Sequence, residues 1–488
     1  MPKLMWLFVV PFLASAAAFI SPPLSGKNWK RFAVVLSLLP LLILLSFGYT
    51  SWIGERVEYD WLPPLSIEFY LSVDSLSLLF LYLTAIIIPI SLLAVRSDHL
   101  PFPHVFYGFV LLLQGLLIGF FAARDLALFT LFWEAMLIPL YFIMSLWGGP
   151  QRRMAALKFL TYMIAGSALM IAAVLALYFA AASVSGTGTF NLDVLPKISE
   201  NAPYAVWLFA IFLLAFSVKT PLFPFHAWLP DAYYQAPTTG TILLSALLSK
   251  AGIYGFLRIG FELFPTYLQE WSPYLLGLAI AGVLYGGLAA WMQNDFKRLI
   301  AYSSFSHVNF VLVGIFVWNQ TAHEGAILQA LNHSVTITGL FLVAGWLEER
   351  LGTTAIGPFS GMAKFLPQLC WLTLVFVLST VALPGTNNFI GELLILFALF
   401  GHHPWLTAIL GLTVILSVIY MLRWMQNVYF EAPSSYQNSW VDIKGKELAI
   451  ALPLVALIFW IGIYPAPILK QIAPATEKNH AVAKLEEQ

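Results

Sequence analysis

The stretch SVKTPLFPFHAWLPDA, from Ser217 to Ala232, decides how the rest of the chain is interpreted. It directly follows the apolar run AVWLFAIFLLAF, which is typical of a membrane-spanning helix. It then places a lysine, three prolines, a histidine and an aspartate where a bilayer requires an unbroken apolar helix. Backbone of this kind is tolerated at membrane depth only where it lines a polar interior. The stretch therefore predicts a broken helix inside a membrane protein.

The composition of the whole chain is that of a membrane protein. Of its 488 residues, 60% are hydrophobic and only 10% are charged, and the mean hydropathy is +0.83. Soluble globular domains carry roughly 25% charged residues, so that class is excluded. Apolar runs of about 17–24 residues recur from end to end, each long enough to cross about 30 Å of hydrocarbon. Because these runs show no alternation, membrane-spanning strands are not expected.

We therefore predict an all-α membrane protein with about fourteen transmembrane helices. The expected spans are 4–20, 32–52, 75–95, 106–122, 126–147, 159–181, 205–232, 238–260, 274–292, 299–318, 325–347, 370–400, 405–428 and 447–464. Two of them, 205–232 and 370–400, are too long for one straight crossing and contain Pro or Gly near the middle. Both are expected to be broken helices.

Charge and cysteine usage exclude several classes of function. The formal net charge is zero, which gives no support for a nucleic-acid partner. The single cysteine, Cys370, cannot form a disulfide framework, an iron–sulfur cluster or a cysteine-rich metal site within the chain. No P-loop or dinucleotide-binding glycine motif occurs, and His402 and His403 stand alone in a loop, so neither a nucleotide site nor a metal site is expected.

The basic residues predict the orientation of the chain. Loops after odd-numbered segments hold about 14 of the 24 lysines and arginines, whereas loops after even-numbered segments hold about 4. The positive-inside rule then places the first set of loops in the cytoplasm and both termini on the outer, periplasmic side. The expected membrane is a bacterial inner (plasma) membrane, with an organelle membrane as the alternative. The first segment, which follows Lys3, also fits a signal peptide, although the later segments can insert without one.

The segments also suggest an internal repeat. Segments four to eight and nine to thirteen line up at an offset of about 165–172 residues, and the two broken segments, seven and twelve, fall opposite each other. Five helices is an odd number, so the second copy enters the membrane with the opposite sense, as an inverted repeat. Evenly sized helices alone also give a regular offset, but they do not explain the matched breaks. The resulting division is 1–100 for the N-terminal helices, 101–262 for the first repeat, 263–430 for the second, and 431–488 for the last helix and tail.

Four ionisable side chains lie within the predicted spans: Glu134, Lys219, Lys250 and Glu392. Each would cost roughly 2.5–3.5 kcal/mol at a helix centre, so such residues usually face a polar interior and function there. A structural ion pair between two helices is the alternative for any one of them. Burial in general lowers the pKa of a lysine and raises that of a glutamate, which brings both toward neutral pH. Four such residues together therefore favour a path for protons.

Histidines add capacity for proton transfer. His307 and His333 fall in the middle of adjacent segments, with serines and threonines nearby that can hold water. A single histidine in a helix bundle is more often a hydrogen-bonded core residue, but two between the lysine of segment eight and the glutamate of segment twelve favour a relay. His226 lies beside the first break, where it either takes part in the relay or caps freed carbonyl groups.

Several motifs together resemble the antiporter-like subunits of respiratory complex I, the NADH:quinone oxidoreductase. These motifs are FWEAMLIPLYFIMSLWGG (132–149), KTPLFPFHAWLPDAYYQAPT (219–238), LLSKAGIYGFLR (247–258), NDFKRLIAYSSFSHVNFVLVGIF (294–316), LNHS (331–334) and LPGTNNFIGELLIL (383–396). The resemblance runs from Asp74 to the end of segment thirteen. Relatives of the same fold serve in multisubunit sodium/proton antiporters, membrane-bound hydrogenases and a ferredoxin-driven photosynthetic complex.

Three types of such subunit, usually called L, M and N, lie side by side in complex I. The L and N types carry a lysine after the break in segment twelve, whereas the M type carries a glutamate. This chain has Glu392 there and ends about 25 residues after its last segment, so it resembles the M type. The resemblance implies L-type and N-type neighbours on either side. It also implies no cofactor in this chain, with NADH, FMN, iron–sulfur clusters and quinone held by partner subunits.

The resemblance also implies a role for each buried charge. The residues that carry protons are expected to be, in order, Glu134, Lys219, Lys250, His307, His333 and Glu392, with a weaker assignment for His226. Glu134 is expected to pair with Lys219 in the inlet half-channel. Lys250 then bridges the halves, and the two histidines lead to the glutamate on the exit side. Two alternatives are a subunit of a sodium/proton antiporter or hydrogenase-type complex, and a scaffold without transport. The residues alone leave open whether the transported ion is a proton or sodium.

Overall fold

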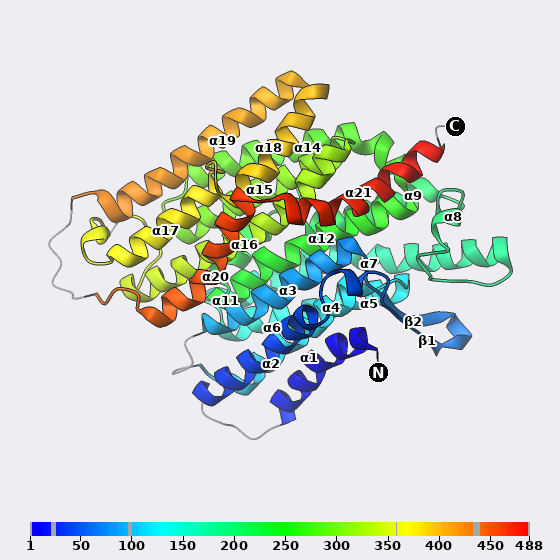
Figure 1. Ribbon diagram of the computed structural model, residues 1–488, viewed down its shortest axis with the longest axis horizontal. Coiled ribbons are helices and arrows are strands. Elements are labelled where there is room, and N and C mark those ends of the chain that lie inside the picture. The colour runs from blue at the N-terminus through cyan, green and yellow to red at the C-terminus, as the bar shows by residue number, and fades with distance from the viewer. Residues whose placement is uncertain (1, 21–25, 96–99, 358, 433–439, 487–488) are drawn as a thin grey trace.

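The computed structural model describes residues 2–20, 26–95, 100–357, 359–432 and 440–486. Within them, twelve helical stretches are long and apolar enough to cross a membrane, packed side by side in one bundle (Figure 1). They are α1 (Lys3–Ile20), α2 (Gly26–Ser46), α3 (Ser75–Leu93), α4 (Pro103–Ala122), α5 (Leu126–Ala135) with α6 (Leu137–Trp147), α7 (Arg152–Ser185), α11 to α13 (Thr238–Leu263), α14 (Pro265–Trp291), α15 (Phe296–Phe316), α16 (Gln320–Leu351), α19 (Pro404–Met425) with η6 (Gln426–Phe430), and α20 (Gly445–Ile463). The chain is a mostly helical, multi-pass membrane protein.

Both spans predicted to be broken are interrupted in the structure. The first consists of α9 (Ala205–Lys219) and α10 (Leu229–Gln235), and the second of α17 (Pro367–Thr380) and α18 (Asn387–His402). At about 1.5 Å per residue, none of these four helices covers about 30 Å of hydrocarbon by itself. Prolines interrupt the first span, and a left-handed glycine, Gly385 with φ of 92°, lies in the second. Each break therefore leaves irregular backbone in the interior of the bundle.

A hairpin and a surface helix lie outside the predicted spans. Strands β1 (Arg56–Leu62) and β2 (Ile67–Ser72) pair antiparallel, and the expectation of an all-helical chain misses them. Their aromatic and β-branched residues suit strands, and they lie between two apolar spans. The C-terminal residues, expected as a tail, form α21 (Ala466–Glu486), which packs against α3 and α16. The remaining short elements are η1 (Thr50–Trp52), η2 (Pro63–Leu65), α8 (Pro196–Ser199) and η5 (Met362–Lys364).

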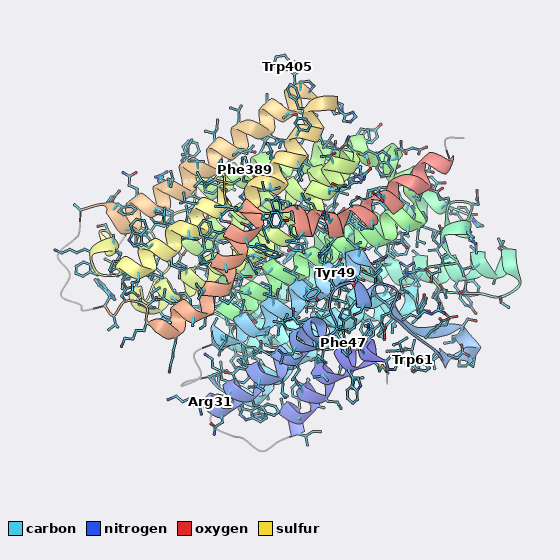
Figure 2. All side chains as sticks on the ribbon, viewed as in Figure 1. Arg31, Phe47, Tyr49, Trp61, Phe389 and Trp405 are labelled. Atoms are coloured by element: carbon cyan, nitrogen blue, oxygen red, sulfur yellow. The ribbon has the colours of Figure 1, made fainter. Side chains whose placement is uncertain are left out.

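The two ends of the bundle differ in character. We call the end that carries Lys30, Arg350 and Lys446 the basic end, and the opposite end, with the β1–β2 hairpin, the hairpin end. Figure 2 shows Arg31 at the basic end and Trp61 at the hairpin end. Helix α1 begins and α21 ends at the hairpin end (Figure 1), so the first and last described helices have these ends on the same side of the bundle.

The stretch Thr238–Leu263 lies at the centre of the bundle, where its apolar window is completely buried. It is an irregular helix: α11 (Thr238–Ile242), the π-turn η3 (Leu243–Leu248), α12 (Ser249–Gly255), a second π-turn η4 (Phe256–Gly260) and α13 (Phe261–Leu263). A Cβ atom on Gly252 would lie 2.0 Å from Oγ1 of Thr220. Only glycine therefore allows α12, which carries Lys250, to approach the end of α9 this closely.

Candidate functional site

Helices α15 and α18 bring His307 and Glu392 together inside the bundle. Nδ1 of His307 lies 3.1 Å from Oε1 of Glu392, and Nε2 of Gln329 on α16 donates to the same oxygen over 3.1 Å. Glu392 is only 3% exposed. A buried carboxyl group needs such partners because it has lost the water that would otherwise surround it. The resemblance implies that both histidines lie between Lys250 and Glu392, with His307 first, whereas here His307 is the histidine in contact with Glu392.

Lys250 and His333 form a second contact, between α12 and α16. Nζ of Lys250 lies 2.6 Å from Nδ1 of His333, 2.8 Å from the carbonyl oxygen of Ser245 and 3.3 Å from Oγ of Ser249. These three partners match the three donors of an ammonium group. Ser245 belongs to the π-turn η3, a local departure from α-helical hydrogen bonding that is frequent at functional sites. When Lys250 donates to Nδ1, the neutral histidine carries its proton on Nε2.

The two contacts face each other across a short gap. The ring centres of His307 and His333 are 6.2 Å apart. Nε2 of both rings is buried and finds no hydrogen-bond partner among the described residues. Buried polar atoms in native proteins are paired with protein groups or with ordered water. In the series from Lys250 to Glu392, the step between the two histidines is therefore not bridged by a hydrogen bond between described protein atoms.

Lys219 and Glu134 are neighbours without an ion pair. Lys219 is the last residue of α9 and is 1% exposed. Its Nζ donates to the carbonyl oxygen of Trp133 over 2.8 Å and lies 3.5 Å from the centre of the indole ring. Within the described residues, no carboxylate oxygen of Glu134 lies within 4.0 Å of the Nζ atom of Lys219, the limit for an ion pair. Oε1 of Glu134 is buried and has no hydrogen-bond partner there. A carbonyl group and an aromatic face thus hold the lysine beside the glutamate.

His226 lies in the first break, packed among aromatic rings. Its ring centre is 4.4 Å from that of Phe305, in a stacked arrangement, and 4.9 Å from that of Tyr285. Its Nδ1 is buried and has no hydrogen-bond partner in the described part of the chain. Ring contacts thus hold His226 in the first break, and its weaker assignment to the relay stays a prediction.

Sequence reasoning passed over Asn309, which holds the first break in place. Its Nδ2 donates to the carbonyl oxygen of Pro221 over 3.2 Å, and its Oδ1 accepts from the backbone N–H of Phe223 over 3.4 Å. A Cβ on Gly282 of α14 would lie 2.3 Å from that Oδ1, so glycine there makes room for the amide. The signal that could have revealed it is an asparagine inside an apolar helix, two residues after His307.

Asparagines also hold the second break in place, although the sequence assigned no role to the asparagine pair, Asn387 and Asn388, of GTNNFIGE. Asn332 and Asn387 exchange hydrogen bonds, each side-chain amide donating to the backbone carbonyl of the other, at 2.7 and 3.1 Å. Oγ of Ser379 donates to Oδ1 of Asn387 over 2.7 Å. Asn332 directly precedes His333, so this network ties the break to the helix that carries the central histidine.

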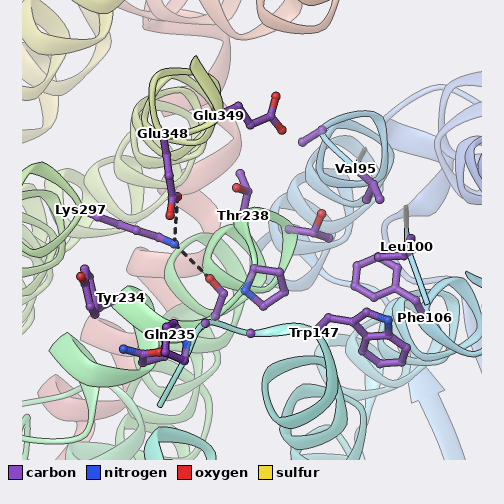
Figure 3. Close-up of a pocket in the computed structure, with 17 residues that line it drawn as sticks. Val95, Leu100, Phe106, Trp147, Tyr234, Gln235, Thr238, Lys297, Glu348 and Glu349 are labelled. Carbon is purple, nitrogen blue, oxygen red and sulfur yellow. Dashed lines mark hydrogen bonds and ion pairs between the residues drawn. The ribbon is translucent and has the colours of Figure 1, made fainter. Parts of the chain in front are cut away.

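A cavity of about 360 Å³ opens at the basic end between the two halves of the chain (Figure 3). Nζ of Lys297 lies 3.5 Å from Oε2 of Glu348 and donates to the carbonyl oxygen of Ala236 over 3.2 Å. Lys297, in the first turn of α15, lines this cavity and is 6% exposed. In the described residues, no three His, Cys, Asp or Glu side chains are grouped so that they could hold a metal ion.

A charge network fixes the hairpin end of the stretch that carries Lys250. Arg258 makes two hydrogen bonds to Asp74, of 2.6 and 2.8 Å, and contacts Glu262 at 2.8 Å. Glu262 also pairs with Arg124 at 3.0 Å. Burial alone would raise the pKa of Asp74, which caps α3, but the Arg258 guanidinium holds that pKa well below its usual range. Helix α3, the loop before α5 and the central stretch are thereby joined.

A multi-pass helical bundle with lysine, histidine and glutamate side chains buried between two broken helices has the architecture of ion-translocating membrane proteins. The sequence model of the NADH:quinone oxidoreductase/Mrp antiporter transmembrane family matches residues 123–419. The chain belongs to this family.

Comparisons with individual proteins agree with that assignment. The chain is 35% identical to NADH-quinone oxidoreductase subunit M of Escherichia coli (strain K12) over 484 residues, which is 95% of each chain. It is also 35% identical to the subunit M of Pseudomonas aeruginosa, over 95% of this chain and 94% of that one. Its structure is similar to a chain of respiratory complex I from Thermus thermophilus, with a TM-score of 0.88 and 33% identity over 98% of both. The fold is shared by a chain of an archaeal membrane-bound sulfane sulfur reductase. That chain is 24% identical, with a TM-score of 0.86 over 96% of this chain and 77% of that one.

Proposed function

We propose that this chain translocates protons as the M-type antiporter-like subunit of an NADH:quinone oxidoreductase. The observation that carries the proposal is the buried series of Lys250, His333, His307 and Glu392, each of which can hold and release a proton. The relatives named as subunit M, matched over almost the whole chain, support the type. In such a complex the redox reaction belongs to partner subunits, and this chain holds no cofactor.

Protons enter beside Glu134 and Lys219 and pass to Lys250 across the contact between α9 and α12. A proton transferred from Lys250 to Nδ1 of His333 is balanced by the release of one from Nε2 of the same ring. A water between the two imidazoles carries that proton to His307. Glu392 receives it and releases it toward the hairpin end.

The organisation of the chain follows from the same proposal. The twelve long spans and the two broken ones make fourteen crossings, arranged as inverted repeats over 101–262 and 263–430. The basic end faces the cytoplasm, so both termini lie on the outer side of a bacterial inner membrane. L-type and N-type subunits flank this one in the membrane.

The test is NADH-driven proton uptake by inside-out vesicles that contain the complete complex. Lys250→Met removes a proton carrier but keeps an unbranched apolar side chain, and we expect proton uptake per NADH oxidised to fall at least about tenfold. Lys364→Met, at an exposed lysine of the basic end, is the matched control and should behave as wild type. Normal proton uptake by the Lys250 variant would overturn the proposal. Transport that requires sodium would instead favour the sodium/proton antiporter alternative.

A further inference from the structure

A groove runs along the outer face of the bundle between α2 and α20. Both helices are peripheral: only 28% of the 18-residue apolar segment of each is buried. The corresponding share is 83% for α3 and 100% for α16, which lie beneath them. Two hollows, of about 490 Å³ and about 360 Å³, lie between α2 and α20, and both have walls from α2, α3, α16 and α20. The larger hollow lies toward the basic end and the smaller toward the hairpin end, and we call the two together the groove.

The larger hollow combines cations with tryptophans. Lys30, Arg350 and Lys446 line it together with Trp346 and Trp440. The indole N–H of Trp440 donates to the carbonyl oxygen of Arg350 over 2.8 Å, which fixes the ring at the mouth. Tryptophan at this level is typical of the boundary between hydrocarbon and headgroups.

The charge around this hollow is net positive. Two glutamates also line it: Glu447, which pairs with Arg350 at 2.8 Å, and Glu349. Lys446 is exposed and has no ion pair within the described residues, and Lys444 lies beside it at the start of α20. Helix α2 adds further basic residues at the same end, including Arg31, which Figure 2 shows there. A positive-inside bias alone explains basic helix ends, but it does not explain why they border a groove.

The smaller hollow is apolar. Leu45, Leu79 and Leu457 are among its walls, and the stacked rings of Tyr49 and Tyr82 lie at its side. On α20, Ile450 is the last residue that lines the larger hollow, and Leu457 is the first that lines the smaller one. The step of seven residues from one to the other corresponds to about 10 Å along the helix. The groove thus presents cations at one end and hydrocarbon about 10 Å deeper.

We infer that this groove binds one anionic phospholipid, with the phosphate at Lys446 and Arg350 and an acyl chain directed toward Leu457. Basic pockets between membrane helices bind anionic headgroups in this way. A helix of a neighbouring protein is the alternative occupant. The cations that line the larger hollow favour the lipid, because an apolar membrane helix has no anionic group to place against Lys446 and Arg350.

The test uses the complete complex in nanodiscs of phosphatidylcholine with a small fraction of phosphatidylglycerol that carries a photoreactive group in its acyl chain. After illumination, digestion and mass spectrometry, we expect adducts on peptides from α2 and α20. Unlabelled phosphatidylglycerol should compete and phosphatidylcholine should not. Lys446→Gln should lower labelling about fivefold, because one cation near an anionic headgroup contributes about that factor. Leu457→Trp, which fills the apolar hollow, should lower it as well.

Lys364→Gln is the matched control, since Lys364 is exposed at the basic end but lines neither hollow. Labelling unchanged in this variant and reduced in the two groove variants would support the site. Equal labelling by phosphatidylcholine and phosphatidylglycerol probes, unaffected by Lys446→Gln, would mean bulk lipid and would overturn the inference. Absence of lipid adducts from both helices would also overturn it and indicate that a neighbouring subunit covers the groove.

Discussion

Glu392 accepts hydrogen bonds from two side chains, and its role can be tested with almost no change of shape. Glu392→Gln keeps the size of the side chain and an oxygen that can face His307 and Gln329, but it cannot take up and release a proton. We expect the complex to assemble and NADH-driven proton uptake to fall at least about tenfold, because the last carrier of the series is lost. Dye-based proton uptake, normalised to the subunit content of the vesicles, measures this.

The lysine variant supplies a comparison at the same position. Glu392→Lys restores an ionisable group, and related subunits are expected to carry lysine there, so it should transport protons better than the glutamine variant. Gln329→Met is the matched control, because it removes one hydrogen bond to Glu392 without removing a titratable group. Wild-type uptake by Glu392→Gln would show that this residue is not the exit carrier.

The raised pKa of Asp125, which caps the start of α5, predicts that the stability of the protein depends on pH. Its carboxylate accepts from the N–H of Leu128, and burial raises its pKa from 3.8 to about 6. The folded protein thus binds this proton more tightly than the unfolded chain, so stability is lost as pH rises from about 4 to about 6, by at most about 3 kcal/mol. Asp125→Asn removes this loss, and its melting temperature relative to wild type should therefore rise between pH 4 and pH 7.

Asp74 has a shift of opposite sign and is the natural control for that experiment. Its folded-state pKa lies below the unfolded value, so its contribution to stability is fully present above about pH 4 and is lost only as pH falls further. Asp74→Asn should therefore melt below wild type by a margin that stays constant from about pH 5 to pH 7. Scanning fluorimetry of the solubilised complex measures both variants. A pH-independent difference for Asp125→Asn would contradict the assignment.

At the scale of elements, the sequence predicts what local chemistry determines. Prolines in 217–232 and the glycine of LPGTNN mark both broken helices, because these residues interrupt a helix wherever it lies. Lys250 and Glu392 are recognised in the same way, since a charge in an apolar run is costly unless it faces a polar interior. The family resemblance places His307 and His333 between Lys250 and Glu392, but only the structure gives which histidine contacts which of the two.

What the sequence did not predict depends on distant contacts. Asn309 is recognisable only when Pro221 and Phe223 are placed against it, 88 and 86 residues away along the chain. The π-turns beside Lys250 and the packing of α21 depend likewise on neighbours that no window of sequence contains. The hydrogen bond from Lys219 to the carbonyl oxygen of Trp133, in place of an ion pair with Glu134, is a matter of side-chain placement rather than composition.

The contact between α9 and α12 can be tested at Gly252. In Gly252→Ala the new methyl group would meet Oγ1 of Thr220 at 2.0 Å and its backbone nitrogen at 2.7 Å, so the two elements must move apart. Overpacking of this kind typically costs about 1–3 kcal/mol. We expect a lower melting temperature of the complex and weaker proton uptake, since Lys250 on α12 moves away from Lys219 on α9. Gly411→Ala, where no atom lies within 4 Å, is the control and should leave both unchanged.

At the scale of the whole molecule, the buried charges form a series rather than a set of separate pairs. Lys219 lies on α9, Lys250 on α12 and Glu392 on α18, and the central stretch Thr238–Leu263 touches both halves of the chain. Asn309, on the helix that carries His307, holds the break beside Lys219, so the second half of the chain supports the first. A displacement in either half would therefore reach the carriers of the other.

A series of carriers predicts that defects in the two halves are not additive. Lys219→Met and Glu392→Gln should each reduce proton uptake about tenfold, and the double variant should transport no worse than the poorer single one. In a series, a block at Lys219 stops protons from reaching Glu392, so a second block at Glu392 has no further effect. If each half instead carried its own protons across the membrane, each single variant would retain about half of the transport and only the double variant would lose it. Proton uptake per NADH oxidised in the three variants, at equal subunit content, distinguishes the two arrangements.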